Sequence, residues 1–299
     1  MLPASLIKTL TNVLPEKSGV PVTIVKTSPV GGGCINDCYR VDTNAGVYFV
    51  KHNDPRRYPG MFDAEAKGLE LLRKHCKDRS SQIMVPKAIA HGMDDHYSYL
   101  ILEFLEGGQM QRDFWDHFGS GMAQLHKHTE NYFGLDHSNY IGSLPQSNTP
   151  HGNWIEFFIT ERMEAQLRMA RDSGHAGREL GKSFQDLYQH LPDIFPEEPP
   201  ALLHGDLWSG NYMIGPGGTA AIVDPAVYYG HRYMDLGMSK LFGGFAPAFY
   251  QSYEAEYPME KNWEEGTEVA NLYPLLVHLN LFGSGYLGSI KSTLRRFRR

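Results

Sequence analysis

The stretch LLHGDLWSGNYMIG, residues 202–215, places His-Gly-Asp directly after a short apolar run. Asn211 lies five residues after Asp206, and a second apolar run, AAIVD, brings in Asp224 thirteen residues after Asn211. Short apolar runs of this kind are typical of buried strands, and the loops beside them carry functional side chains. The pattern therefore predicts one site built from two loops, with two carboxylates and an amide.

Phosphoryl transfer from ATP requires groups of these types at this spacing. One carboxylate, here Asp206, must face the attacking hydroxyl, orient it and accept its proton. Asn211 and Asp224 would hold Mg²⁺ on the phosphates, because Mg²⁺ prefers hard oxygen ligands. We expect His204 to be structural and to brace the loop. His-Gly-Asp alone is also compatible with a metal hydrolase, whereas the complete spaced set favours phosphoryl transfer.

An ATP clamp is predicted in the first part of the chain. Lys51 ends the strand-like run VYFVK, and Glu65 lies fourteen residues further on, in a predicted helix. An ion pair between them would hold the lysine against the α- and β-phosphates. Without the downstream motif, the same two residues would be interpreted as a surface lysine and a surface glutamate.

Glycines and a hinge complete the predicted nucleotide site. Gly31, Gly32 and Gly33 lie at a predicted hairpin upstream of Lys51, where backbone N–H groups could approach phosphate closely. A glycine triplet alone is weak evidence, since many hairpins contain one. In LILEFLEGG, the backbone at Glu103 and Leu105 could bond adenine.

The order of elements predicts an α+β, two-lobed fold. Residues 21–51 carry β-branched and aromatic residues between glycine-rich and Asn-Ala-Gly turns, which is typical of hairpins. We expect an N-terminal ATP-clamping lobe of residues 1–105, with a five-stranded antiparallel sheet and one main helix near 62–76, and a hinge near 103–108. Residues 109–299 are expected to form a larger, mostly helical lobe with the catalytic loop and the substrate site. Its predicted helices include 176–191, 235–256 and 262–282.

Composition excludes several classes of protein. The chain has 299 residues, a net charge of −6 and a hydrophobic fraction of 41%, which is ordinary for a globular protein. No broad basic field is present, so we expect no nucleic-acid partner. The most apolar stretch is interrupted by His278 and Asn280, so no membrane span is expected. The three cysteines favour a reducing cytoplasm over a disulfide framework. Oligomeric state is left open.

Together these motifs resemble a known fold. The order glycine-rich hairpin, Lys51, Glu65, hinge, H-G-D-x-x-x-x-N and Asp224 is similar to the protein-kinase-like fold of aminoglycoside phosphotransferases, in which His-Gly-Asp replaces the His-Arg-Asp of protein kinases. Five longer stretches resemble the fructosamine kinase (ketosamine-3-kinase) family: GGGCIND, WIEFFITERMEAQL, HGDLWSGN, DPAVYYGHRYMDLGMSKLFGGF and HLNLFGSGYL. The likeness covers nearly the whole chain. One departure is HRYMD, where bacterial relatives more often carry an acidic residue after His-Arg.

The resemblance implies an activity and its cofactors. With ATP and Mg²⁺, the enzyme would phosphorylate the 3-hydroxyl of a ketosamine, the rearranged adduct of a sugar with a free amine or a protein lysine. The phosphate would then leave, the remaining imine would hydrolyse, and the amine would be freed. By the same resemblance, Asp235 would brace the catalytic-loop backbone from the next helix.

Substrate contacts are harder to predict. Trp208, beside the base, is the candidate for stacking on the sugar, with loop packing as the equal alternative. Tyr228 and His231 follow the metal aspartate and are further candidates. Cys34 in the glycine loop suggests redox control, because backbone N–H groups lower a thiol's pKa; a small residue at a turn is the alternative.

Other functions are weighed against this one. A kinase of the same fold could act on an aminoglycoside, choline or a sugar. A nucleotide-binding scaffold without activity would be expected to lack Lys51, Asp206, Asn211 or Asp224, and all four are present. A protein serine/threonine kinase is disfavoured because no Ala-Pro-Glu-like segment follows Asp224. The preferred sugar, and whether its amine is free or protein-bound, stay open.

Overall fold

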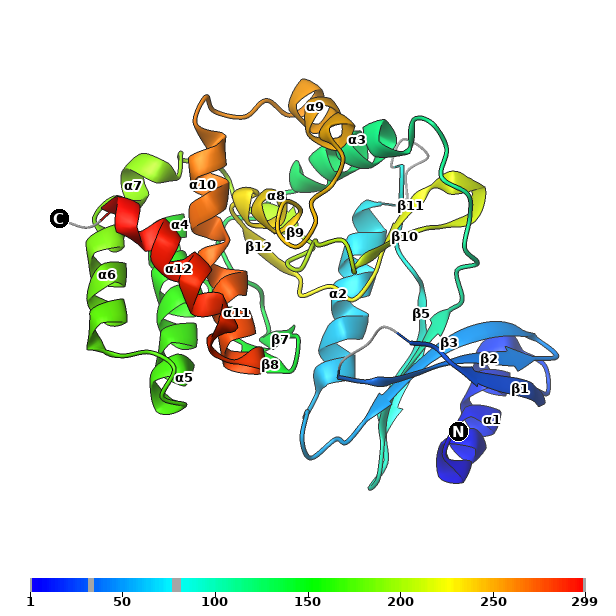
Figure 1. Ribbon diagram of the computed structural model, residues 1–299. Helices are drawn as coiled ribbons and strands as arrows, with labels where there is room; N and C mark the ends of the chain where they lie inside the picture. Colours follow the sequence, from blue (N-terminus) through cyan, green and yellow to red (C-terminus); the bar gives the residue numbers. More distant parts are fainter. Residues whose placement is uncertain (1, 32–34, 77–81, 298–299) are drawn as a thin grey trace.

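The structure is a computed structural model that describes residues 2–31, 35–76 and 82–297. A β-sheet built by the N-terminal part of the chain occupies one end of the molecule, and most of the helices occupy the other (Figure 1). The predicted α+β, protein-kinase-like class is confirmed by this architecture and by the structural comparison below.

The N-terminal sheet has five antiparallel strands in the order β1-β2-β3-β6-β5. They are β1 (Ile24–Pro29), β2 (Asp37–Thr43), β3 (Gly46–Asn53), β5 (Ala88–Met93) and β6 (Ser98–Glu103). Helix α1 (Ala4–Ser18) buries its leucines against one face of the sheet, in a cluster that includes Val50. Successive side chains of a strand point to opposite faces. Lys51 therefore points away from α1, towards helix α2 (Met61–His75).

A short strand from the first part of the chain joins the larger lobe. Strand β4 (Ile83–Met84) pairs in parallel with β11 (Ala220–Ile222), which in turn pairs with β10 (Tyr212–Ile214). The backbone N–H of Gly108 also donates to the carbonyl of Ile214, over 2.7 Å. The predicted boundary near residue 105 therefore has one exception, because β4 belongs to the sheet of the catalytic loop.

Helix α3 packs against this small sheet, and most other helices of the larger lobe lie further from the five-stranded sheet (Figure 1). Asn153 caps the first turn of α4, with its side-chain oxygen accepting from the backbone N–H of Glu156 over 2.8 Å. The helical elements are α3 (Phe114–His126), α4 (Trp154–Phe157), a π-helix (Phe158–Glu164), α5 (Ala165–Asp172), α6 (Arg178–Tyr188), α7 (Leu191–Ile194), α8 (Tyr233–Met238), α9 (Pro247–Glu256), α10 (Trp263–Ala270), α11 (Leu272–Phe282) and α12 (Leu287–Leu294), with short 3₁₀ turns at Pro216–Gly218, Ser284–Tyr286 and Arg295–Phe297. Two small antiparallel sheets complete it: the hairpin of β7 (Asn139–Ile141) with β8 (Leu144–Gln146), and the pair of β9 (Ala201–Leu203) with β12 (Tyr228–Gly230).

Two of the predicted helices are divided. The prediction of a helix over 235–256 is wrong in its middle, since α8 ends at Met238 and α9 begins at Pro247. The segment between α8 and α9 contains Phe242, Gly243 and Gly244, and all three have positive φ. A right-handed helix cannot include this conformation. The predicted 262–282 helix is likewise split into α10 and α11. The first break matters for the site, because it places Phe242 beside the catalytic loop.

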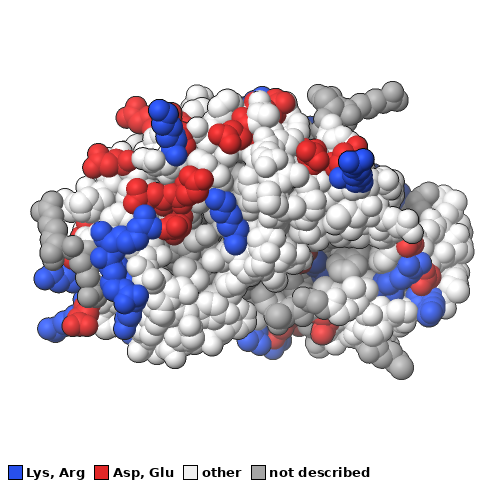
Figure 2. All heavy atoms as spheres, turned by 45° about the horizontal axis from the view of Figure 1, so that its top comes forward, with Lys and Arg blue, Asp and Glu red and all other residues white. Residues whose placement is uncertain are grey.

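The surface and the cysteines agree with the composition. Basic and acidic side chains are interspersed on the face seen in Figure 2, and no broad basic area forms there. Within the described ranges, no helix is long and apolar enough to cross a membrane. Cys38 carries a thiol that is not part of a disulfide.

Candidate active site

The catalytic loop runs from β9 to β10 and is held by His204. This imidazole is fully buried. Its Nε2 lies 2.9 Å from the carbonyl oxygen of Val223, and its Nδ1 lies 3.3 Å from the backbone N of Asp206. A neutral ring with the proton on Nε2 satisfies both contacts, and burial lowers the pKa of His204, which favours that neutral form. His204 thus fastens the loop of Asp206 to the strand that leads to Asp224.

Asp235 on α8 also stabilises this loop. Its fully buried carboxylate accepts the backbone N–H groups of His204, over 2.7 Å, and Gly205, over 2.9 Å. The turn requires glycine, because Gly205 has φ +83° and a Cβ there would lie 2.0 Å from the carbonyl oxygen of Ala226. His126 approaches the same carboxylate at 3.2 Å. These contacts are those expected of a residue that braces the catalytic loop.

Asp206 and Asn211 face each other across this loop. The side-chain amide of Asn211 donates to Oδ2 of Asp206 over 2.8 Å and to its backbone carbonyl over 2.9 Å. Burial raises the pKa of Asp206 to about 7, although the hydrogen bond from Asn211 acts in the opposite direction. A carboxyl group with a pKa near neutrality can accept a proton from a hydroxyl and later release it.

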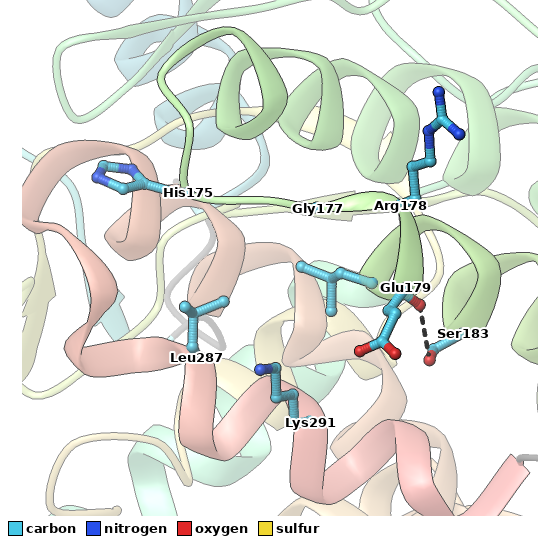
Figure 3. Close-up of a pocket in the computed structure, with 8 residues that line it drawn as sticks. His175, Gly177, Arg178, Glu179, Ser183, Leu287 and Lys291 are labelled. Carbon is cyan, nitrogen blue, oxygen red and sulfur yellow. Dashed lines mark hydrogen bonds between the residues drawn. The ribbon is translucent and has the colours of Figure 1, made fainter.

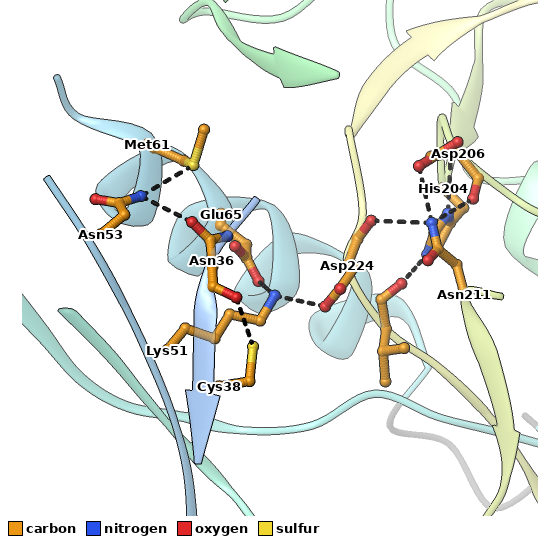
Figure 4. A network of polar contacts seen from close by, with 11 residues as sticks. Asn36, Cys38, Lys51, Asn53, Met61, Glu65, His204, Asp206, Asn211 and Asp224 are labelled. Atoms are coloured by element: carbon orange, nitrogen blue, oxygen red, sulfur yellow. Dashed lines mark hydrogen bonds and ion pairs between the residues drawn. The ribbon is translucent and has the colours of Figure 1, made fainter. Parts of the chain in front are cut away.

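Lys51 joins the two lobes at Asp224. Its Nζ lies 2.7 Å from Oε1 of Glu65 on α2 and 2.5 Å from Oδ1 of Asp224, as Figure 4 shows. The Lys51 side chain is only 3% exposed, whereas that of Asp224 is 49% exposed. Burial alone would lower the pKa of Lys51, but the two carboxylates outweigh this effect and raise it. Lys51 is therefore a buried cation.

The donor set fits a phosphate-bound Mg²⁺. Both amide contacts of Asn211 to Asp206 use its nitrogen, which leaves its Oδ1 as a ligand, and the half-exposed Asp224 carboxylate lines the same cavity. Among the described residues, no group of three or more His, Cys, Asp or Glu side chains forms a cage for a metal ion. Mg²⁺ is commonly held by one or two protein oxygens together with substrate phosphates, so two ligands are sufficient.

A cavity of about 470 Å³ extends from these residues between the lobes. Lys51, Glu65, Asp206, Asn211 and Asp224 line one end. Aromatic rings line the other end, and we call five of them the aromatic wall: Trp208, Phe242, His278, Phe282 and Tyr286.

The wall brings together three separate segments. Trp208 packs edge-on against Phe242, with ring centroids 6.3 Å apart, and Phe242 lies 4.6 Å from the ring of His278. Trp208 comes from the catalytic loop, Phe242 from the break between α8 and α9, and the other three residues from α11 and the turn after it. Of the predicted substrate residues, Trp208 is therefore placed in the cavity.

Tyr228 and His231 do not line this cavity, which corrects their prediction as substrate contacts. Both are fully buried within the larger lobe. The ring of Tyr228 lies 4.0 Å below the guanidinium of Arg162. The imidazole of His231 packs against Phe195, and its Nε2 lies 3.2 Å from the carbonyl oxygen of Pro196. Both side chains belong to the core that supports the loops.

The structure describes only part of the glycine-rich hairpin that is predicted to bind the nucleotide. Gly32, Gly33 and Cys34 lie outside the described residues, and Gly31 immediately precedes them. These positions, and the redox hypothesis for Cys34, keep the status of predictions.

At the hinge, two groups of Glu103 are already engaged. Its N–H donates to the carbonyl of Lys87 over 3.0 Å, and its carboxylate accepts the N–H of Lys87 over 2.7 Å. The predicted contact of Glu103 with adenine would therefore use its backbone carbonyl. Leu105 lies in the connection that follows β6.

Sequence reasoning missed most of the substrate end. Phe242, His278, Phe282, Tyr286 and Tyr140 were not predicted as site residues, yet all line the cavity. A signal was present in HLNLFGSGYL, where a histidine and two aromatic residues recur every four positions, a spacing that places His278 and Phe282 on one side of α11.

A second cavity lacks comparable chemistry. It measures about 290 Å³ and lies between α6 and α12, with His175, Arg178 and Lys291 in its lining (Figure 3). Ser183 there donates to the backbone carbonyl of Glu179 over 3.1 Å. None of the predicted catalytic residues borders it. The interlobe cavity is therefore the candidate active site.

Comparison with known proteins agrees with this geometry. The model of the family described as fructosamine kinase matches residues 6–299. The chain belongs to the fructosamine kinase family. A candidate ketoamine kinase from Synechocystis is 38% identical over 97% of this chain and 96% of its own length. A protein-ribulosamine 3-kinase of Arabidopsis thaliana, named as chloroplastic, is 38% identical over 94% of this chain and 85% of its own length.

Solved structures support the same assignment. The crystal structure of a candidate fructosamine-3-kinase from Thermobifida fusca is also similar, with 31% sequence identity and a TM-score of 0.84. The match covers 96% of the present chain and 97% of the Thermobifida chain. An aminoglycoside phosphotransferase matches 96% of the chain and 98% of its own, with a TM-score of 0.62 and 14% identity. At that identity the likeness shows the fold alone. The predicted family is confirmed, and so is the predicted likeness of its fold to that of aminoglycoside phosphotransferases.

Proposed function

We propose that this protein transfers the γ-phosphoryl group of ATP to the 3-hydroxyl of a ketosamine. The observation that carries the proposal is the convergence of Asp206, Asn211, Asp224 and Lys51 at one end of a single cavity. Family membership supports the substrate class, since the relatives are named as ketoamine and ribulosamine kinases.

Asp206 is the proposed base. Its carboxylate lies in the cavity at the end of a loop fixed by His204 and Asp235, so the substrate hydroxyl would meet a positioned acceptor. The hydrogen bond from Asn211 orients Oδ2 and leaves Oδ1 for the hydroxyl. As the oxygen attacks phosphorus, its proton passes to Asp206 and ADP leaves.

Asn211, Asp224 and Lys51 would bind the nucleotide and its metal ion. Asn211 Oδ1 and Asp224 would hold Mg²⁺, which when bound neutralises charge on the phosphates. Lys51 would contact the phosphates, oriented by Glu65. In this structure Lys51 is paired with Asp224, the residue proposed to bind the metal. The phosphates would therefore contact the lysine and the metal ion at the same place.

Release of the amine requires no further enzyme group. A phosphate on C3 becomes allylic once the ketosamine enolises towards C1, and it leaves as inorganic phosphate. The imine that remains takes up water and separates into a sugar dicarbonyl and the free amine. We therefore propose a role in deglycation. A cytoplasmic location stays a prediction from the low cysteine count.

ADP release with Mg-ATP tests the proposal. Ribulose-lysine, fructose-lysine, kanamycin and choline would be compared, with Asp206→Asn as the control for contaminating kinases. We expect turnover on the ketosamines that disappears in Asp206→Asn. Turnover on kanamycin or choline alone would keep the fold and the mechanism and overturn the substrate class.

A further inference from the structure

The aromatic wall lies where the amine of a ketosamine would be. Trp208 is two residues from Asp206 in sequence, and both line the same cavity. In a ketosamine only C2 and C1 separate the amine from C3, the carbon whose hydroxyl Asp206 would receive. A substrate with that hydroxyl at Asp206 must therefore place its amine close to the catalytic loop. This step rests on the proposed function.

That amine carries a positive charge, because a secondary alkylamine is protonated near neutral pH. The carboxylates among the described residues that line the cavity are Glu65, Asp206 and Asp224, and Glu65 is paired with Lys51. Asp206 and Asp224 are assigned to the hydroxyl and the metal. A cation that binds against the wall loses part of its water shell, which is costly unless another interaction compensates.

The rings form a concave, partly exposed surface rather than a closed core. Phe282 is 57% exposed and Phe242 is 37% exposed, and both rings pack on His278, with centroids 5.4 Å and 4.6 Å from it. Tyr286 lies 5.1 Å from the same imidazole. Exposed aromatic faces attract cations through the ring quadrupole.

His278 stays compatible with a cation. Its Nδ1 lies 2.7 Å from the carbonyl oxygen of Pro274, four residues earlier in α11, so the ring proton is on Nδ1 and Nε2 is an acceptor. Burial lowers the pKa of His278, which keeps the ring neutral. A neutral imidazole does not repel an ammonium group, and its Nε2 can accept a hydrogen bond from one.

Phe242 is held in place at a conformational cost. It is one of two non-glycine residues with positive φ among the described residues, at 55°. This conformation is unfavourable for an L-residue, because its Cβ comes too close to the following carbonyl oxygen. The carbonyl of Phe242 accepts from Ser209 Oγ over 3.3 Å, which ties the ring to the catalytic loop. Strain of this kind is retained where surrounding contacts or function require it.

We propose that the aromatic wall binds the protonated secondary amine of the ketosamine by cation–π contact. Phe242 and Phe282 are the specificity-determining residues, since they offer the most exposed rings. They select a substrate for its charge at nitrogen, whereas Asp206 selects for the hydroxyl.

A matched pair of substrates separates charge from shape. One is the N-butyl ketosamine of fructose; the other is its O-butyl ether, in which a neutral oxygen replaces the ammonium. We would measure kcat/KM for both with the wild type, Phe282→Leu, Phe282→Tyr and the double variant Phe242→Leu/Phe282→Leu. The first two variants differ only in whether the ring is kept.

The expected result is a preference for the amine that depends on the rings. Each lost ring should lower the amine-to-ether ratio of kcat/KM about threefold, and the double variant about tenfold, while Phe282→Tyr keeps the wild-type ratio. Equal ratios in the wild type and both leucine variants would overturn this inference alone. No turnover of the amine by the wild type would overturn the proposed function and this inference with it.

Discussion

Lys51 on β3 and Asp224 after β11 lie 2.5 Å apart, although 173 residues separate them in the chain. This ion pair joins the N-terminal sheet to the loop that carries the predicted metal ligand. It is buried on the lysine side and half-exposed on the aspartate side. The nucleotide phosphates would therefore meet the lysine from the N-terminal lobe and the ligands from the larger lobe at one point.

Replacing the proposed base tests its role directly. Asp206→Asn keeps the size of the side chain and removes its capacity to accept a proton. We expect kcat on a ketosamine to fall by about 10²–10⁴-fold, with the KM for ATP little changed. Steady-state ADP release measures both constants. A loss of less than tenfold would show that another group accepts the proton.

The pH dependence should report the raised pKa of Asp206. Activity requires the ionised carboxylate, so kcat/KM should be highest above the pKa and fall tenfold per unit as the pH drops below about 7. The profile would be measured from about pH 3 to pH 9 in buffers of constant ionic strength, so that a limb at either pKa is within range. An acidic limb near pH 4, the ordinary value for aspartic acid, would contradict the assignment.

The Lys51–Glu65 pair should contribute to stability as a unit. Lys51→Met leaves a carboxylate without its buried partner, and we expect it to lower the free energy of unfolding by about 3 kcal/mol. Adding Glu65→Gln to Lys51→Met should recover part of this loss. Urea denaturation of the two single variants and the double variant gives the coupling energy. Strictly additive effects would show that the two residues act independently.

Asp235 should be needed for the geometry of the catalytic loop. In Asp235→Asn only one side-chain oxygen remains, so either the His204 or the Gly205 N–H loses its buried acceptor. The expected loss is about 2 kcal/mol in the free energy of unfolding, accompanied by a lower kcat. Glu16→Gln, on the distant helix α1, serves as a charge-matched control. Unchanged stability in Asp235→Asn would remove Asp235 from this role.

The sequence predicted the parts of the site that local spacing determines. Asp206, Asn211 and Asp224 are recognisable because one loop and one neighbouring strand fix their separation. The Lys51–Glu65 pair is similar, since a strand followed by a helix brings the two side chains together.

The substrate end was not predictable in the same way. Tyr228 and His231 follow Asp224 closely, but β12 and the start of α8 carry both into the core. Phe242 enters the cavity because positive φ values interrupt a segment that has a helical pattern in the sequence. Hydrophobic periodicity does not predict the backbone conformation of a single residue. The other wall residues come from the far end of the chain, and only tertiary packing brings them to Trp208.

The central claim concerns which oxygen receives the phosphate. Phosphorus NMR of the product formed from fructose-lysine and Mg-ATP identifies that position, with Asp206→Asn run in parallel. The account predicts a phosphate monoester at the 3-hydroxyl that forms with the wild type, is absent with the variant, and decays to inorganic phosphate and free lysine. A monoester at another hydroxyl, or no transfer by a protein that still binds ATP, would contradict it.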